Sequence, residues 1–209
     1  MSLKIGAAKV KKDYGRVEDG AYPARIVEII DFGQQIETDW KTKEVKCYED
    51  GNLMIKPKVW ITFEFPDELI TVDGVDKPRW YGKDYTVSAH EKSAMASLMK
   101  AVDPKNTSDG YIPKLLGLPA MVTMGSTSTG NAKIAGVSAV PKGMQVGALV
   151  SPESFFDLDS GTVEAFNGLP RWMQEKIKGG VGFDGTKLAD KLSKTAQTPT
   201  EVKVRVEDY

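Results

Sequence analysis

The sequence predicts a mainly β domain of the α+β class. Three observations lead to this prediction: several runs rich in β-branched and aromatic residues, one amphipathic helical segment, and further β-type runs after that segment. The chain has 209 residues, of which 41% are hydrophobic, so it is long enough to bury a core of its own.

The first predicted strand covers Tyr22–Phe32. Its apolar residues occupy both parities, which is typical of a strand buried on both faces or of a barrel strand. A shorter strand is expected over Lys43–Glu49. Asp50-Gly51 follows it as a candidate type I′ turn that leads into the second long strand.

The second long strand ends in the run KVWITFEF, residues 58–65, which alternates cleanly. Its apolar side carries Val59, Ile61, Phe63 and Phe65. Its other side carries Lys58, Trp60, Thr62 and Glu64. Asp73-Gly74 lies in the next connection, and Arg79–Val87 is expected to form the third long strand.

The hydrophobic period changes from 2 to 3.6 after Ser88, which predicts a helix. Ser88 and Glu91 fit a capping box, and Asp103-Pro104 ends the segment. The apolar positions of this helix follow helical spacing: Met95, Leu98, Met99 and Val102.

Two more strands are expected at about Ala120–Met124 and Lys133–Val140, with a bulge at Gly136. Five strands with one helix between the third and the fourth have the element order of an OB-fold barrel. We therefore predict an OB-fold-like five-stranded barrel over residues 20–141.

The flanking segments differ in composition from this domain. Residues 1–19 are expected to form a flexible basic arm, and residues 142–209 a C-terminal extension with short helices and a polar tail. Within the extension, Ser151-Pro152-Glu153 resembles a helix start, and a two-turn helix is predicted after Pro170. A weaker helical patch covers Lys187–Leu192, and the final run EVKVRVEDY alternates like an edge strand.

Composition and motifs argue against several functional classes. Lys plus Arg is 28 and Asp plus Glu is 29, which argues against a globally basic nucleic-acid binder but not against a local basic face. One Cys and one His are too few for the common zinc sites. His90 shows no nucleophile-triad spacing, and no phosphate-binding fingerprint occurs. We therefore expect a cytoplasmic protein without enzymatic activity, cofactor, metal or membrane contact.

Basic and aromatic residues alternate on the predicted third strand, where Arg79, Tyr81, Lys83 and Tyr85 share one parity. If this strand pairs with the second, one outer face would present these four residues together with Lys58 and Trp60. Flat rings on which bases stack, set among cations that contact phosphates, are what single-stranded nucleic acid requires. The alternative is that these rings cover a second apolar layer of the protein.

Two further residues are candidates for the same role. Trp40, in the segment TDWKTK and flanked by Lys41 and Lys43 in a predicted loop, would stack on a base or anchor the loop on the barrel. Arg25, on the first strand, would contact a phosphate. The basic arm would add phosphate contacts or remain a solvated tail.

The chain resembles bacteriophage single-stranded DNA-binding proteins of the OB-fold type over about residues 20–178. The runs that carry the resemblance are GAYPARIVEIIDFG, KVWITFEF, GKDYTVSAHEKSAMASLMKAV, IPKLLGLPAMVTM and FNGLPRWMQEKI. The resemblance implies a protein that coats single-stranded DNA during phage replication or recombination and contacts phage or host replication proteins. It also implies an acidic tail. The end Glu207-Asp208-Tyr209 departs from that pattern, because Lys203 and Arg205 interrupt it.

The sequence thus predicts sequence-independent binding of single-stranded DNA. The main alternative is a phage structural or assembly protein that uses the same barrel face for protein contacts, including contacts between its own copies as a homo-oligomer. A carbohydrate-binding barrel would use the same rings with fewer cations. The lysines and arginine among the rings favour a polyanion.

Overall fold

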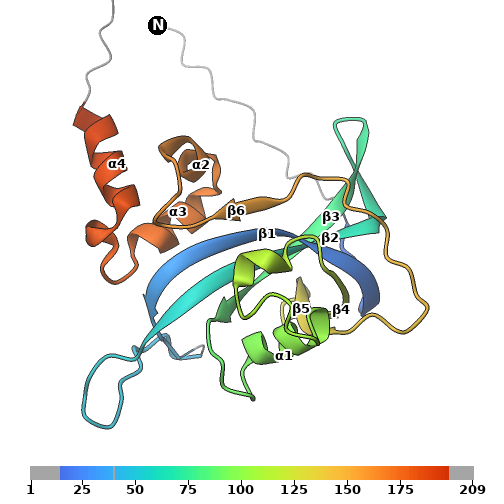
Figure 1. Cartoon of the computed structure of the whole chain (residues 1–209), viewed down its shortest axis with the longest axis horizontal. Helices are drawn as coiled ribbons and strands as arrows, with labels where there is room; N and C mark the ends of the chain where they lie inside the picture. Colours follow the sequence, from blue (N-terminus) through green and yellow to red (C-terminus); the bar gives the residue numbers. More distant parts are fainter. Residues whose placement is uncertain (1–14, 40, 198–209) are drawn as a thin grey trace, which may run out of the picture.

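A curled antiparallel sheet forms the centre of the molecule (Figure 1). The computed structural model describes residues 15–39 and 41–197. The five long strands are β1 (Gly20–Ile36), β2 (Ile55–Val72), β3 (Val75–Thr86), β4 (Pro119–Ser126) and β5 (Ala132–Ser138), in the order β3-β2-β1-β4-β5. Within the described residues no strand pairing joins β3 to β5, so the sheet is a curled half-barrel.

The helix α1 (Ala94–Val102) and the 3₁₀ turn η1 (Ile112–Leu115) lie between β3 and β4 in the chain, as the sequence predicted for its helix. Met95, Leu98 and Val102 of α1 are buried against the inner side of the curled sheet. The predicted capping box is wrong. Ser93 is the N-cap, since its hydroxyl accepts from the N–H of Ala96, and α1 begins five residues after the expected position.

The C-terminal part covers the outer side of β1 (Figure 1). It comprises β6 (Ser154–Phe156), α2 (Val163–Gly168), α3 (Arg171–Lys178), the 3₁₀ turn η2 (Phe183–Gly185) and α4 (Lys187–Gln197). The predicted helices after Pro170 and at Lys187 are confirmed. The predicted helix start at residues 151–153 is wrong, because this segment leads into β6, which pairs in parallel with β1.

Two hydrophobic cores share β1. Ile26 and Ile29 face the inner core with the apolar stripe of β2, and Ile30 and Phe32 face an outer core built with α2, α3 and α4. Register shifts at Ile26/Glu28 and Asp31/Gly33 alter the simple alternation along β1. Of the two alternatives that the pattern of this strand left open, burial on both faces is the one that the structure shows.

The type I′ turn predicted at Asp50-Gly51 is wrong, and a turn of that type forms at Asp73-Gly74 instead. Asp73 and Gly74 both have positive φ and join β2 to β3 as a two-residue type I′ hairpin. At the other pair, φ is positive at Gly51 but not at Asp50, so the turn is not type I′. The strand expected over residues 43–49 is reduced to isolated bridges at Val45 and Cys47.

Residues 15–19, which we assigned to a flexible arm, lie against the sheet. Val17 is buried in the inner core, and its N–H donates to the Tyr81 hydroxyl at 3.2 Å. The Arg16 guanidinium donates to the carbonyl of Gly130 between β4 and β5, and Arg79 donates to the carbonyl of Gly15. This segment therefore bridges β3 and the β4–β5 loop. Residues 1–14 and the predicted terminal strand at 201–209 lie outside the described residues.

Arg25 and Glu64, register partners on β1 and β2, hold the connection from β5 to β6. The Arg25 guanidinium donates to the carbonyls of Val146 and Gly147, as well as to that of Gly117. The Glu64 carboxylate is fully buried. It accepts hydrogen bonds from the backbone N–H groups of residues 150 and 151, which lie farther along the same connection. None of the helices in the described part of the chain is long and apolar enough to cross a membrane.

Phe166→Ala tests whether the outer core contributes to stability. Phe166 is fully buried, so its truncation should lower the free energy of unfolding by about 3–5 kcal/mol, measured by urea denaturation. Phe155→Ala is the control, because this ring is 41% exposed, and it should cost less than about 1 kcal/mol. Equal losses in the two variants would contradict this assignment.

Asp103→Asn tests the turn after α1. Hydrogen bonds from the N–H groups of Ser108 and Thr107 hold the pKa of the Asp103 carboxyl well below its ordinary value. The carboxylate therefore stabilises the fold above about pH 4 and loses this effect as the pH falls through its lowered pKa. Urea denaturation should show that Asp103→Asn is less stable than the wild type at pH 7. The difference in free energy of unfolding between the two proteins should become smaller as the pH is lowered.

Asp109→Asn, a change at an exposed residue of the same loop, is the control and should change the stability at pH 7 by less than about 0.5 kcal/mol. A difference between wild type and Asp103→Asn that stays constant with pH would show that the charge on Asp103 has no such role.

Candidate nucleic-acid interface

The predicted binding face combined Trp60 with Tyr81 and Tyr85, and this grouping is wrong. The pairing of β2 with β3 puts Val59 opposite Tyr85 and Phe63 opposite Tyr81, so both tyrosines share the inner face. Tyr85 is only 3% exposed, and burial raises its pKa to about 12. Each strand's alternation is as predicted, but parity within a strand does not determine its register with a neighbour.

Trp60 lies on the outer face, as expected. Its ring covers the backbone of Gly82 on β3, where an added Cβ would lie 2.3 Å from Trp60 Nε1. Trp172 of α3 meets the Trp60 ring edge-on, with centroids 5.0 Å apart and planes at 71°. Phe32 is near both indoles. Trp172 is 46% exposed, so one ring of this pair is open to a ligand.

A chain of two hydrogen bonds, through Thr62 to Glu28, orients the Trp60 ring. Its Nε1–H donates to the Thr62 hydroxyl at 3.0 Å, and that hydroxyl donates to Glu28 Oε2 at 2.8 Å. Burial raises the pKa of Glu28, although the hydrogen bond from Thr62 opposes this shift. Together with Gly82, this chain holds the indole flat against the sheet.

Three surface hollows border Asp84, the register partner of Trp60. Their volumes are about 510, 550 and 480 Å³. Among the described residues, eight lysines line them: Lys43, Lys46, Lys56, Lys58, Lys83, Lys92, Lys133 and Lys176. The acidic residues that line them are Asp84 and Glu37. We call this region the lysine surface.

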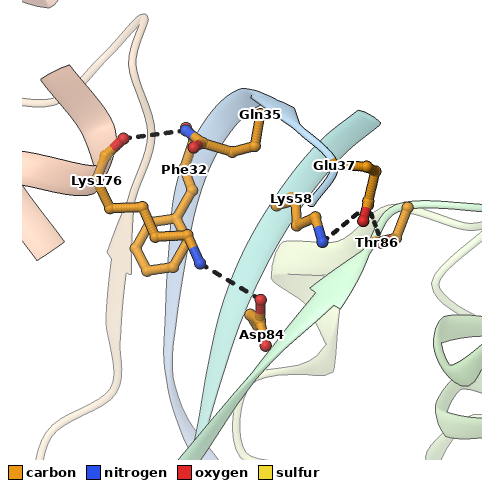
Figure 2. A network of polar contacts seen from close by, with 7 residues as sticks. All are labelled: Phe32, Gln35, Glu37, Lys58, Asp84, Thr86 and Lys176. Carbon is orange, nitrogen blue, oxygen red and sulfur yellow. Dashed lines mark hydrogen bonds and ion pairs between the residues drawn. The ribbon is translucent and has the colours of Figure 1, made fainter. Parts of the chain in front are cut away.

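Two ion pairs organise the lysine surface (Figure 2). Lys58 Nζ lies 2.8 Å from Glu37 Oε1, and Lys176 Nζ lies 3.3 Å from Asp84 Oδ2. The Lys176 ammonium also lies 4.8 Å from the centre of the Phe32 ring. Each acid thus holds a lysine in place at the surface, where an anion would compete for it.

The other predicted binding residues have varied positions. Lys58 and Lys83 belong to the lysine surface, with Lys83 in the hollow between β3 and β5. Arg25 is occupied by three carbonyl groups, so its guanidinium serves the fold. Arg79 contacts Gly15 instead. Trp40 lies outside the described residues.

Sequence reasoning missed several residues of this surface, notably Lys56, Lys133, Trp172 and Lys176. The helix that contains Trp172 was predicted, and its amphipathic pattern shows that one face must be buried. The pattern does not say against which strand the helix packs. The sequence therefore predicted the helix but not its position beside Trp60.

A second, mostly apolar depression runs along α1 and η1. Two adjoining hollows of about 480 and 420 Å³ share Val87, Gly110 and Ile112. Asp31, Asp157 and Asp159 border one end. Among the described residues that line this depression, Lys100 is the one cation, against four carboxylates, so it suits a phosphate backbone less well than the lysine surface.

Comparisons of this chain with models of protein families, with curated proteins and with solved structures find no match. Functional inference therefore depends on the site itself.

Gly82→Ala tests the position of the Trp60 ring. The new methyl group would overlap the indole, which Trp172 and the sheet confine, so we expect a loss of about 1–3 kcal/mol and a shifted tryptophan emission. Gly136→Ala on β5 is the matched control, since no atom lies within 4 Å of its Cβ position. Unchanged emission and stability in Gly82→Ala would contradict the ring placement.

Proposed function

We propose that this protein is a non-catalytic, sequence-independent single-stranded DNA-binding protein that acts in phage DNA replication or recombination. The observation that carries the proposal is the lysine surface, where eight lysines line hollows beside the paired rings of Trp60 and Trp172. Phosphates would contact the ammonium groups, and bases would stack on the open indole at about 1–3 kcal/mol per base.

The charge distribution supports this proposal despite a formal net charge of −1. Eight lysines line the hollows of the lysine surface, while Asp31, Asp157 and Asp159 border the depression along η1 and β6. A local basic surface attracts a polyanion even when the whole chain is nearly neutral, because the potential near the surface depends on nearby charges.

The topology supports an OB-fold-like assignment. The order β3-β2-β1-β4-β5 with a helix between β3 and β4 is the one expected of an OB-fold-like barrel left partly open, which favours this assignment. Proteins of that fold bind oligonucleotides on strands 2 and 3 and the loops joining strands 1–2 and 4–5. Trp60 and Asp84 lie on those strands, Lys43 and Lys46 lie in the first of those loops, and Lys133 follows the second.

Titration with a thirty-nucleotide oligo-dT, beside a duplex of the same length, tests the proposal through quenching of tryptophan fluorescence. The wild type should bind the single strand, with a log–log salt slope of about −0.7 per phosphate neutralised. The double variant Lys58→Ala/Lys176→Ala should bind more weakly and reduce the slope by about 1.4.

Lys77→Ala/Lys105→Ala provides the matched control, because both lysines are exposed and neither lines the lysine surface. It should bind like the wild type. If the wild type shows no response at low salt, the proposal is wrong. Sedimentation would then test the alternative, a phage structural or assembly protein that uses this face for protein contacts.

A further inference from the structure

Asp84 is an acidic residue in the middle of the lysine surface. It borders all three hollows, whereas Glu37 borders only the hollow near the β1–β2 loop. Asp84 is the register partner of Trp60, and both residues border the same hollow. Lysines line each hollow around it.

The Asp84 carboxylate is accessible to a ligand. Its side chain is 43% exposed, although it pairs with Lys176 at 3.3 Å. Figure 2 shows Asp84 on β3 facing Lys176 of α3, with the Lys58–Glu37 pair to one side. A phosphate placed over the rings would meet this negative charge, while a phosphate farther out would meet mainly lysines, with Glu37 in the hollow near the β1–β2 loop.

This arrangement affects single strands and duplexes differently. A single strand can turn its bases toward the rings and direct its phosphates to the lysines on either side. A duplex presents its phosphates on the outside and keeps its bases stacked within, so it cannot place bases over Trp60 and Trp172. An acid at the centre therefore opposes a duplex more than a single strand, which is specificity by repulsion of the wrong ligand.

We propose that Asp84 is a specificity-determining residue that selects single-stranded DNA over duplex DNA. This inference depends on the proposed function, because it concerns the ligand of the same surface. Asp84 acts at the ligand and not through the placement of Lys176. Glu37, which pairs with Lys58 and borders only the hollow near the β1–β2 loop, has no such selective effect.

The test compares Asp84→Asn with Glu37→Gln, two variants that each remove one negative charge beside a paired lysine. Dissociation constants are measured for oligo-dT and for the matched duplex at one fixed salt concentration. Asp84→Asn should tighten duplex binding about tenfold and single-strand binding less than about twofold. Glu37→Gln should tighten both by the same factor. Asp84→Glu, which keeps the charge, should retain the wild-type preference.

Thermal unfolding first checks that each variant is folded. Equal tightening of both ligands by Asp84→Asn would overturn the inference and leave the proposed function standing. Weaker single-strand binding by this variant would also overturn it, since Asp84 would then merely position Lys176. Failure of the wild type to bind oligo-dT at all would overturn both proposals.

Discussion

The burial of β1 on both faces is the constraint on which the rest of this structure depends. Ile26 and Ile29 require an inner core, and Ile30 and Phe32 require an outer one. The curled sheet and α1 supply the first, and the C-terminal helices supply the second. Because the outer core packs over Phe32, it brings α3 beside β2, and Trp172 reaches Trp60 only for this reason. The candidate site is therefore a consequence of how the outer face is covered.

Two polar residues of the sheet, Arg25 and Glu64, fix the path of the connection from β5 to β6, which leads to the C-terminal helices. Arg25 and Glu64 are neighbours across β1 and β2, and together they bind carbonyl and N–H groups of residues 146–151. A buried carboxylate without donors would be costly, so this connection and Glu64 stabilise each other. The same segment then leads into β6. This strand pairs with residues 28–30 of β1, after the stretch of β1 that pairs with β4. The polar contacts of Arg25 and Glu64 and the apolar contacts of the outer core thus act together to place the C-terminal helices over β1.

The lysine surface combines positive charge with internal neutralisation. Lys58 and Lys176 are held by Glu37 and Asp84, which limits repulsion among the lysines in the free protein. The Lys176–Asp84 pair is partly exposed, and such pairs contribute little to stability and exchange readily with an incoming anion. The rings are more rigidly held, because Gly82, Thr62 and Phe32 fix the Trp60 indole. The surface thus joins a fixed aromatic element to cations that can change partners.

The sequence by itself determined the type and order of most elements, the inner apolar stripe of β2 and the double burial of β1. These features follow from local periodicity, which is a property of neighbouring residues along the chain. It also identified Trp60 and Lys58 on the outer face of β2. The prediction that Tyr81 and Tyr85 lie on the outer face was wrong, because the register between β2 and β3 depends on contacts across the sheet. The contributions of Trp172 and Lys176 were decided by tertiary structure alone, since an amphipathic pattern shows that a helix must be covered but not which surface covers it.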